Sequence, residues 1–315
     1  MRSQLIMPHR IFIDGGAGTT GIEIADRLAG RSEYVLITLG DDLRKDKSAR
    51  REALNDADVT ILCLPDAAAR GAVDLLDQGS RTRIIDASSA HRTADGWCYG
   101  FPELVGRERV ASARRISNPG CYPTGFLALI APLVREGLLP DDWPYTVNAV
   151  SGYSGGGKPL IARFEEPDAP AYRGYGYDLA HKHMPEMQTH AQLTRPVLFA
   201  PAVVPAFRGM IVEVPLHLGA MDASPSPQSL RDALSEYYAD APTITVLADE
   251  PPAETILKPN SQGWDGMELS IYASSDGRIA RLVARFDNLG KGASGAAVQN
   301  LNLACGIKET AGLRL

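Results

Sequence analysis

Cysteine is scarce in this sequence, which has four in 315 residues, at Cys63, Cys98, Cys121 and Cys305. The four are scattered, with no Cys-x-x-Cys pair and no spacing of cysteines and histidines typical of a zinc site. A chain of this length buries enough core to need no disulfide framework, and free thiols fit a reducing compartment. We therefore expect a cytoplasmic protein with neither disulfides nor a metal site.

Long apolar runs are absent as well. No segment approaches the roughly 20 apolar residues that cross a bilayer. The opening MRSQLIMPHRIFIDGG lacks the apolar stretch and the small-residue cleavage site of a signal peptide. We expect no membrane segment and no export signal, and either Met1 or Met7 as the natural start.

Excess positive charge is the third feature that the sequence lacks. The formal net charge is −6, and basic residues gather only in the short stretches RKDKSARR and RERVASARR. Because binding to nucleic acid requires a concentrated face of Lys and Arg, this balance argues against a general nucleic-acid binder. We expect no nucleic-acid partner.

The first third of the chain alternates short apolar runs with amphipathic stretches, the pattern of a parallel sheet flanked by helices. A chain of 315 residues suits two domains, since domains usually have about 100 to 200 residues. We expect an α/β fold that opens with a doubly wound, Rossmann-type parallel sheet. Its predicted strands are 10–16, 34–40, 58–65 and 82–88, and its predicted helices are 19–31 and 66–79.

After about residue 145 the runs become long and strand-like, with turns between them, as in a mostly antiparallel sheet. We expect an α+β second domain with strands at 145–152, 196–218, 243–249, 267–274 and 279–288 and helices near 184–194 and 226–239. The small-residue helix 292–307 is predicted to return to the first domain. The expected domains are residues 1–120, completed by about 291–315, and residues 121–290.

A glycine-rich loop follows the first predicted strand and opens the first predicted helix. In DGGAGTTGIEIADRL the G-x-G-x-x-G glycines are Gly16, Gly18 and Gly21, with Ala17, Thr19 and Thr20 between them. Glycine permits the tight turn and lets a pyrophosphate approach the helix N-terminus. We expect these six residues to bind a nicotinamide dinucleotide.

The end of the second predicted strand bears on the choice between NAD and NADP. An NAD-binding protein sets an acidic residue on the ribose about 20 residues after the loop, and Asp41 and Asp42 stand there. Arg44 and Lys45 follow within a few positions, and cations suit the extra 2'-phosphate of NADP. The basic pair favours NADP, and the acidic pair leaves NAD open.

Cys121 is placed for reactivity in RRISNPGCYPTGFLALIAPLV. Gly120 before it, Pro123 after it and the apolar run that follows predict a helix starting at the cysteine. A helix N-terminus lowers the pKa of a thiol, and its N–H groups can bind the oxyanion formed when a thiolate attacks an acyl carbon. Together with a nicotinamide site, this indicates a thioester that is reduced to an aldehyde. Cys63 and Cys305 lie in apolar surroundings and are interpreted as core residues.

Six motifs across residues 11–303 resemble one family, the N-acetyl-gamma-glutamyl-phosphate reductases of arginine biosynthesis in their shorter form. They are SNPGCYPTG, GAGTTG, SGYSGGGK, HKHMPE, VPAFRGM and GKGASGAAVQN. The resemblance implies NADP-dependent reductive dephosphorylation of N-acetyl-L-glutamyl 5-phosphate to the 5-semialdehyde, with Cys121 as the nucleophile. It also implies an architecture shared with aspartate-semialdehyde dehydrogenase and, more distantly, with glyceraldehyde-3-phosphate dehydrogenase.

The segment YGYDLAHKHMPEMQTH supplies candidate proton carriers. An imidazole with a pKa near its ordinary value of about 6.5 can donate a proton to the reacting oxygen. The resemblance assigns this role to His183, with His181 as the alternative. Glu186 either orients the imidazole, contacts substrate or caps the helix that opens at Pro185.

The acyl phosphate substrate also carries a carboxylate, so the site needs cations and N–H donors. Arg208 in PAFRGM suits a clamp on either group. The resemblance adds possible contacts with substrate and cofactor. The expected substrate contacts are Ser151, Gly152, Ser154, Arg208, Arg92 and Glu186, with Lys158 and Glu103 as further positions, and the expected cofactor contacts include Ser88 and Asn300.

Two other functions stay open. One is the related lysine-pathway reductase, which acts on an aminoadipyl phosphate attached to an acidic carrier protein and would require a basic docking surface. The other is a catalytically silent NADP-binding sensor, which would not need a cysteine at a helix start. The long strands of the second domain indicate self-association, and we expect a homodimer or a homotetramer.

Overall fold

The computed structural model describes residues 7–247 and 251–315. The possible start before Met7 and the last two residues of the predicted strand 243–249 lie outside these residues. The chain divides into two compact units, one of Met1–Pro119 with Ala296–Leu313 and one of Gly120–Gly295 with Arg314–Leu315. Within the described residues, no helix combines the length and the apolar character that crossing a membrane requires.

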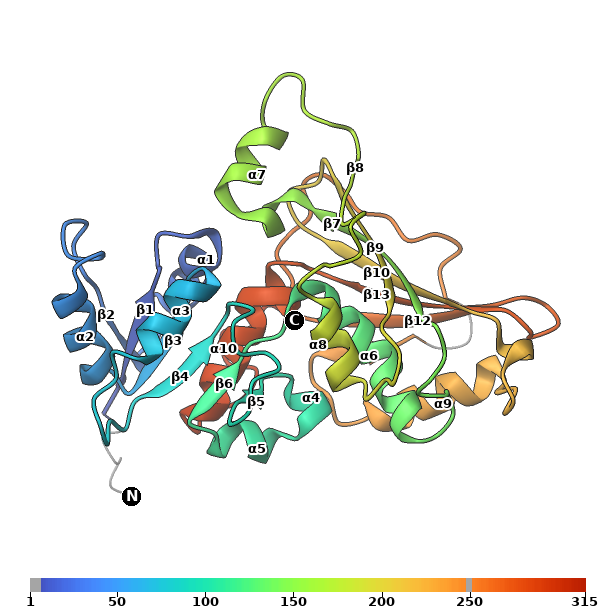
Figure 1. Ribbon diagram of the computed structural model, residues 1–315, viewed down its shortest axis with the longest axis horizontal. Coiled ribbons are helices and arrows are strands. Elements are labelled where there is room, and N and C mark those ends of the chain that lie inside the picture. The colour runs from blue at the N-terminus through green and yellow to red at the C-terminus, as the bar shows by residue number, and fades with distance from the viewer. Residues whose placement is uncertain (1–6, 248–250) are drawn as a thin grey trace. The chain divides into compact units, whose positions relative to one another are not determined.

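The first unit is built on a parallel sheet with the strand order β2-β1-β3-β4-β6-β5 in the described part of the chain. Its strands are β1 (His9–Asp14), β2 (Tyr34–Ile37), β3 (Val59–Leu62), β4 (Arg83–Asp86), β5 (Cys98–Tyr99) and β6 (Arg115–Ser117). The helices between them are α1 (Thr19–Leu28), α2 (Lys47–Asp56), α3 (Asp66–Val73), α4 (Pro102–Val105) and α5 (Arg107–Ser112) (Figure 1). Strands β2 and β3 lie on opposite sides of β1, which makes the carboxyl end of β1 a topological switch point.

Neighbouring residues of β1 pack into two different hydrophobic cores, one on each face of the sheet. Ile11 packs with Ile24 of α1 and with Leu301 of the C-terminal helix α10 (Gly295–Ala304). The next residue, Phe12, packs on the other side of the sheet with Leu54 of α2. Both sheet faces are therefore covered, which explains the apolar centres of β1, β3 and β4, and the expected doubly wound Rossmann-type sheet is confirmed.

The second unit contains a mixed sheet with the order β11-β12-β13-β10-β7-β9-β8 in the described residues. These strands are β7 (Thr146–Gly152), β8 (Arg173–Gly174), β9 (Leu198–Val204), β10 (Met210–Leu216), β11 (Ile244–Val246), β12 (Met267–Ala273) and β13 (Ala280–Phe286). Pairing is antiparallel except between β7 and β9 and between β11 and β12, so the expected mostly antiparallel sheet is confirmed.

Helix α6 (Cys121–Arg135) forms the centre of the second unit. Its residues from Tyr122 to Leu133 are buried, because α6 packs on β10 and β13 and against α8 (Met184–His190) and α9 (Pro227–Tyr237) (Figure 1). A Cβ on Gly125 would lie 2.7 Å from Val212 Cγ2, so only glycine allows this close helix-to-sheet approach. The position of Cys121 therefore depends on a tightly packed helix.

Some elements differ from the predicted ones. The run 196–218 is two strands, β9 and β10, separated by a turn at residues 205–209. Pro205 has no N–H to continue the ladder, and Gly209 has a φ of 110°, which turns the chain back. Helices α2 and α7 (Gly157–Phe164) were not predicted, since their sequences are rich in charge or glycine. Strands β5 and β6 have two and three residues, too few for a periodic pattern.

Candidate functional site

The glycine loop of the first unit has the form that the sequence predicts. Gly18 is the N-cap of α1, and its N–H donates to Gly15 O at 3.0 Å, which closes the turn after β1. A Cβ on Gly21 would lie 2.7 Å from Gly16 Cα, so helix and loop touch through glycine alone. The loop stands at the switch point of the sheet, where the N–H groups of the first turn of α1 can bind an anion.

The residues predicted near the ribose follow β2, at the carboxyl edge of the sheet, where the glycine loop also lies. Arg44 pairs with Asp41 at 3.2 Å, and both side chains are exposed, as is Lys45. A further arginine, Arg50 of α2, donates to the buried carboxylate of Asp14 at 2.7 Å. The basic character of this edge therefore extends beyond the predicted pair.

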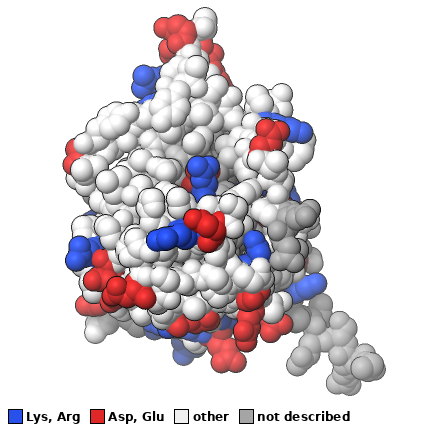
Figure 2. Space-filling view, turned by 90° about the vertical axis from the view of Figure 1, so that its right-hand side faces the viewer, with Lys and Arg blue, Asp and Glu red and all other residues white. Residues whose placement is uncertain are grey.

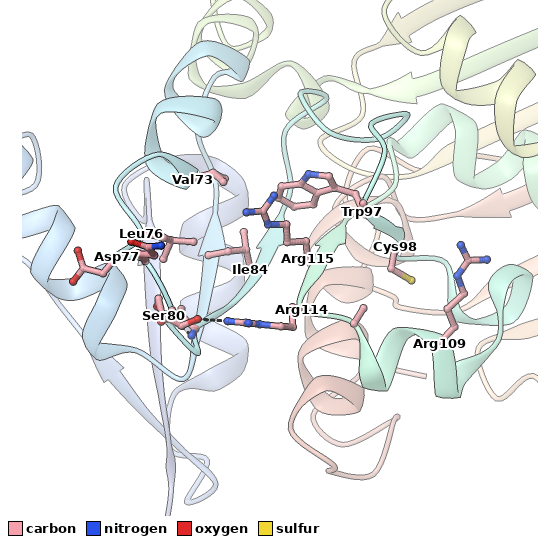
Figure 3. A pocket seen from close by; sticks show the side chains of 15 residues that line it. Val73, Leu76, Asp77, Ser80, Ile84, Trp97, Cys98, Arg109, Arg114 and Arg115 are labelled. Carbon is pink, nitrogen blue, oxygen red and sulfur yellow. Dashed lines mark hydrogen bonds between the residues drawn. The ribbon is translucent and has the colours of Figure 1, made fainter.

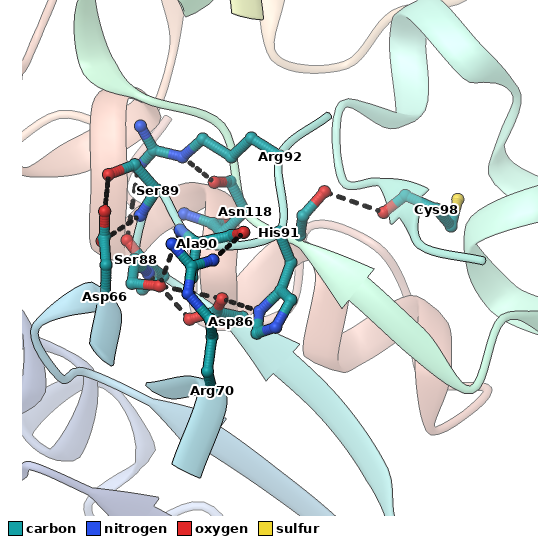
Figure 4. A network of polar contacts seen from close by, with 12 residues as sticks. Asp66, Arg70, Asp86, Ser88, Ser89, Ala90, His91, Arg92, Cys98 and Asn118 are labelled. Atoms are coloured by element: carbon teal, nitrogen blue, oxygen red, sulfur yellow. Dashed lines mark hydrogen bonds and ion pairs between the residues drawn. The ribbon is translucent and has the colours of Figure 1, made fainter. Parts of the chain in front are cut away.

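A polar network follows the carboxyl end of β4 (Figure 4). Asp86 is fully buried and accepts hydrogen bonds from the N–H and the hydroxyl of Ser88, both at 2.9 Å. His91 Nδ1 lies 2.6 Å from Asp86 Oδ2, the oxygen that also accepts from the Ser88 hydroxyl. These contacts hold Ser88 at the carboxyl edge of the sheet, where the glycine loop also lies, and the sequence analysis did not predict the roles of Asp86 and His91 in them.

Arg92 and Asn300 meet at Asn118. Arg92 Nε donates to Asn118 O at 3.1 Å, and another nitrogen of Arg92 donates to Ala87 O at 3.2 Å. Asn300 Nδ2 donates to Asn118 Oδ1 at 3.0 Å and to Gly100 O at 2.9 Å. Arg92, predicted to contact substrate, lies in the first unit and binds the backbone of the segment that leads into Cys121.

These residues fit a dinucleotide. Asn300 Oδ1 is buried, and no partner for it exists among the residues that the structure describes. A buried amide oxygen without a partner is costly, and a bound carboxamide N–H would satisfy it. The glycine cradle and this acceptor both belong to the first unit.

Cys121 is the first residue of α6, as predicted. Its neighbour Gly120 is the N-cap, and the Gly120 N–H donates to Glu186 Oε1 at 2.7 Å. Glu186 belongs to the first turn of α8 and is buried, so the carboxylate fixes the start of α6 next to the start of α8. Cys121 remains partly exposed, while the helix residues from Tyr122 to Leu133 are buried.

The two candidate histidines lie together at the start of α8. His183 is the N-cap residue of α8 and is buried, and its ring centroid lies 4.8 Å from that of His181 and 5.8 Å from that of Tyr122. His181 Nδ1 accepts from the His183 N–H at 3.2 Å. Burial, reinforced by Lys182, lowers the pKa of His181, which disfavours its charged form.

Three loops of the second unit gather the predicted substrate contacts. A Cβ on Gly152 would lie 2.7 Å from Ala206 O, so glycine lets the loop after β7 touch the turn after β9. The Ser154 N–H donates to Phe207 O at 3.1 Å, and Ser154 Oγ accepts from Asn288 Nδ2 at 2.9 Å. Ser151 is buried at the end of β7, whereas Lys158 is exposed.

Arg208 is buried in the same group of loops. Its guanidinium donates to Asp287 Oδ2 at 3.0 Å, and that carboxylate also accepts from the N–H groups of Trp264 and Leu289. Burial raises the pKa of Asp287, and the neighbouring Arg208 opposes this effect. Asp287 and Asn288 were missed by the sequence analysis, although an acidic residue directly after an apolar strand is a usable signal.

The remaining cysteines lie in apolar surroundings. Burial raises the pKa of Cys63 and that of Cys305 to about 12, and it also raises the pKa of Cys98. Among the described residues, no group of three or more His, Cys, Asp or Glu side chains has the geometry of a metal site. Glu103, another predicted position, accepts from Gln299 of α10 at 2.8 Å.

Comparison with known proteins supports this arrangement. The model of the semialdehyde dehydrogenase dimerisation domain matches residues 121–288, and that of the semialdehyde dehydrogenase NAD binding domain matches residues 36–113. An N-acetyl-gamma-glutamyl-phosphate reductase of Brucella ovis is 48% identical over 309 residues, covering 95% of this chain and 100% of the relative. The reductase of that name from Trichormus variabilis is 46% identical, with 96% and 99% covered.

Solved structures share the fold at low sequence identity. Aspartate semialdehyde dehydrogenase II of Vibrio cholerae has a TM-score of 0.67 at 16% identity, covering 94% of this chain and 98% of that one. The enzyme of Candida albicans, solved with NADP, has a TM-score of 0.65 at 14% identity, covering 95% and 99%. With two domain models in chain order and near-half identity over almost its whole length, the chain belongs to the N-acetyl-gamma-glutamyl-phosphate reductases of the semialdehyde dehydrogenase family.

Proposed function

We propose that the protein catalyses NADPH-dependent reduction of N-acetyl-L-glutamyl 5-phosphate to N-acetyl-L-glutamate 5-semialdehyde and phosphate, a step of arginine biosynthesis. The observation that carries this proposal is the start of α6, where Cys121 follows a glycine whose N–H is bound by Glu186. The names of the curated relatives give the substrate class.

Cys121 acts as the nucleophile. The N-terminus of α6 stabilises the thiolate, which adds to the acyl carbon to give a tetrahedral intermediate; the carbon–oxygen bond to phosphate breaks as this intermediate collapses. The positive end of the α6 dipole lies at Cys121 and stabilises the oxyanion of the tetrahedral intermediate. The products are a thioester on Cys121 and inorganic phosphate.

His183 is the proton carrier. Reduction of the thioester places negative charge on the thiohemiacetal oxygen, and the protonated imidazole stabilises it by donating its proton; the proton returns to the imidazole as the aldehyde forms and the thiolate of Cys121 leaves. His183 caps α8, whose first turn is tied to Gly120 through Glu186, so the imidazole and the thiol come from adjacent helix starts. His181, whose pKa burial lowers, supports the His183 backbone through Nδ1.

The loops around Arg208 hold the substrate. Arg208 binds its carboxylate or its phosphate, and Asp287 fixes the orientation of the guanidinium from behind. Ser151, Gly152 and Ser154 line the same group of loops. Glu186 acts on the substrate indirectly, by fixing the helix start that carries Cys121.

The first unit binds the dinucleotide. When bound, NADPH supplies the hydride for reduction. Gly16, Gly18 and Gly21 with Ala17, Thr19 and Thr20 would hold its pyrophosphate, Asn300 Oδ1 would accept from its carboxamide, and Ser88 lies at the carboxyl edge of the sheet, where the glycine loop also lies. Arg44 and Lys45 favour NADP over NAD, and Arg50 adds a cation nearby.

The second unit joins copies of the chain, as a homodimer or a homotetramer in the cytoplasm. Its matching family model describes a dimerisation domain. Along β10, residues alternate between buried and half-buried, so one sheet face packs on helices and the other is available. On the side of the molecule drawn in Figure 2, a broad area carries few charged side chains.

A substrate panel tests the function. The protein is incubated with NADP, phosphate and N-acetyl-L-glutamate 5-semialdehyde, and the nicotinamide absorbance is followed over time. We expect turnover with this aldehyde and much less with aspartate semialdehyde or with the longer aminoadipate semialdehyde. Preference for the aminoadipate compound would assign the lysine-pathway reaction, and absence of turnover with all three would indicate the non-catalytic sensor.

A further inference from the structure

A pocket lies in the first unit, and its lining does not include the glycine loop (Figure 3). Its volume is about 830 Å³, which lies within the range of small-molecule sites. Its lining comes from the end of α3 and the segment after it, from α5, and from residues at or next to the first residues of β4, β5 and β6. The pocket therefore opens at the amino ends of these strands, whereas the glycine loop and Ser88 lie at the carboxyl ends.

The lining of this pocket is basic in an acidic protein. Arg109, Arg114 and Arg115 contribute to it, and the acidic lining residue Asp77 is already bound by Arg51 at 3.0 Å. Among the described residues, no carboxylate pairs with any of the three arginines. Placing cations together without counter-ions is unfavourable, and a bound anion would relieve this repulsion.

Arg115 and Trp97 form the middle of the pocket. The Arg115 guanidinium lies 5.9 Å from the Trp97 ring centroid, and the two side chains lie side by side in Figure 3. Trp97 stacks on His91 at 4.0 Å, which holds the ring in place. Ile84 and Val73 supply an apolar wall beside them.

The two other arginines mark the ends of the pocket. Arg114 donates to Ser80 O at one end, and Arg109 lies beyond Cys98 at the other (Figure 3). Guanidinium groups bind carboxylate and phosphate through paired N–H donors. The combination of guanidinium groups, an indole and an apolar wall suits a ligand with an anionic head and a flat apolar part.

We propose that this pocket binds a small molecule that carries a phosphate or carboxylate group next to an apolar or aromatic part. The site is separate from the reaction described above, and it does not depend on the proposed function. Arg115 is its principal anion-binding residue, Trp97 contacts the apolar part, and Arg109 contributes a second cation.

Binding of two matched probes tests the proposal. Phenyl phosphate and benzoate share an aromatic ring and differ in the anion, and benzyl alcohol is their neutral counterpart. Each is titrated by calorimetry into the full-length protein saturated with NADP. We expect millimolar or tighter binding of at least one anion and none of the alcohol, and the preferred anion identifies the ligand as a phosphate or a carboxylate.

Variants locate the binding. Arg115→Gln removes a charge-assisted pair and should weaken binding by about tenfold or more. Arg81→Gln removes an exposed arginine that does not line the pocket, and it should leave binding unchanged. In Trp97→Phe the fluorescence change caused by the probe should disappear while anion binding persists.

Three results would overturn the proposal. One is that neither anion binds the wild-type protein. Another is that Arg115→Gln and Arg81→Gln bind as tightly as the wild type, which would place the probe at another site. The third is that Arg115→Gln changes the oligomeric state in sedimentation without any probe binding, which would make this face an interface between copies.

Discussion

Cys121 differs from the other three cysteines in its place in the fold, and this place sets the reactivity of its thiol. It is the first residue of a helix, whereas burial raises the pKa of Cys63, Cys98 and Cys305. Because the thiolate is the reactive form, iodoacetamide near neutral pH should label Cys121 first. Peptide mass spectrometry over a time course measures this order, and equal labelling of all four would contradict a stabilised thiolate at Cys121.

The two histidines can be separated by their kinetics. If His183 donates the proton, His183→Asn should lower kcat by about 10²–10⁴-fold with little change in the affinity for NADP. His181→Asn is the matched control and should have a smaller effect on kcat, because His181 contacts the His183 backbone. Steady-state kinetics and a cofactor titration give both quantities, and the reverse order of effects would assign the proton to His181.

His181 also links folding to pH. Burial lowers its pKa in the folded state, while the unfolded chain titrates near the ordinary value of 6.5. As pH falls through about 6.5, the unfolded state takes up a proton that the folded state resists, so the free energy of unfolding decreases. Above that pH the two states bind no extra proton and the loss vanishes.

His181→Gln removes this titration. We expect urea unfolding of the variant to lose less stability than the wild type between about pH 7 and pH 5.5. His217→Gln serves as a control histidine outside the site. If the variant and the wild type lose stability equally over this range, the titration of His181 does not contribute to the pH dependence of the free energy of unfolding.

At the scale of elements, the packing of α6 on its sheet fixes the nucleophile. A Cβ at Gly125 would meet Val212 and Phe286 within 2.7 and 2.8 Å, so Gly125→Ala forces α6 away from β10 and β13. We expect a loss of about 1–3 kcal/mol in the free energy of unfolding and a lower kcat.

Gly71 provides the matched control for this substitution. It also lies within a helix, α3, but nothing within 4 Å opposes a Cβ there. Gly71→Ala should be neutral or stabilise by up to about 1 kcal/mol, since alanine has the higher helix propensity. Chemical denaturation compares the two, and equal effects would show that the space around Gly125 is not limiting.

Local signals in the sequence account for much of the fold and for the centre of the site. The apolar strands 10–16 and 58–65, the glycine loop and the helix start at Cys121 each depend on neighbouring residues, and the structure has β1, β3, α1 and α6 there. Contacts between distant segments were not predictable in this way. The bonds from Gly120 to Glu186 and from Arg208 to Asp287 span 66 and 79 residues.

The hydrogen-bond partners of Asp86 and Arg208 are examples of contacts that the sequence analysis did not predict. Asp86 was predicted only as a residue of the strand 82–88, yet its carboxylate accepts from Ser88 and contacts His91, two and five residues further along the chain. Arg208 was predicted to bind substrate, and folding shows that a buried carboxylate also holds it. The Asp86 contacts are local and depend on the turn that follows β4, whereas tertiary packing brings Asp287 to Arg208 across 79 residues of chain.

At the scale of the whole molecule, the second unit is expected to join copies of the chain. Light scattering coupled to size-exclusion chromatography should give the mass of two or four chains, each of 33.8 kDa. Charge reversal at Glu213, half-buried on the outward face of β10, should shift the mass toward one chain. Reversal at the exposed Glu236 of α9 is the control, and a monomeric wild type would contradict the expected assembly.

The central claim is that Cys121 carries the acyl group as a thioester. In the oxidative direction without phosphate, the semialdehyde and NADP should produce a burst of nicotinamide absorbance equal to one per active site and then stop. Mass spectrometry should find the acetylglutamyl group on Cys121, and added phosphate should restore turnover. Steady turnover without phosphate, or a burst that persists in Cys121→Ser, would contradict the account.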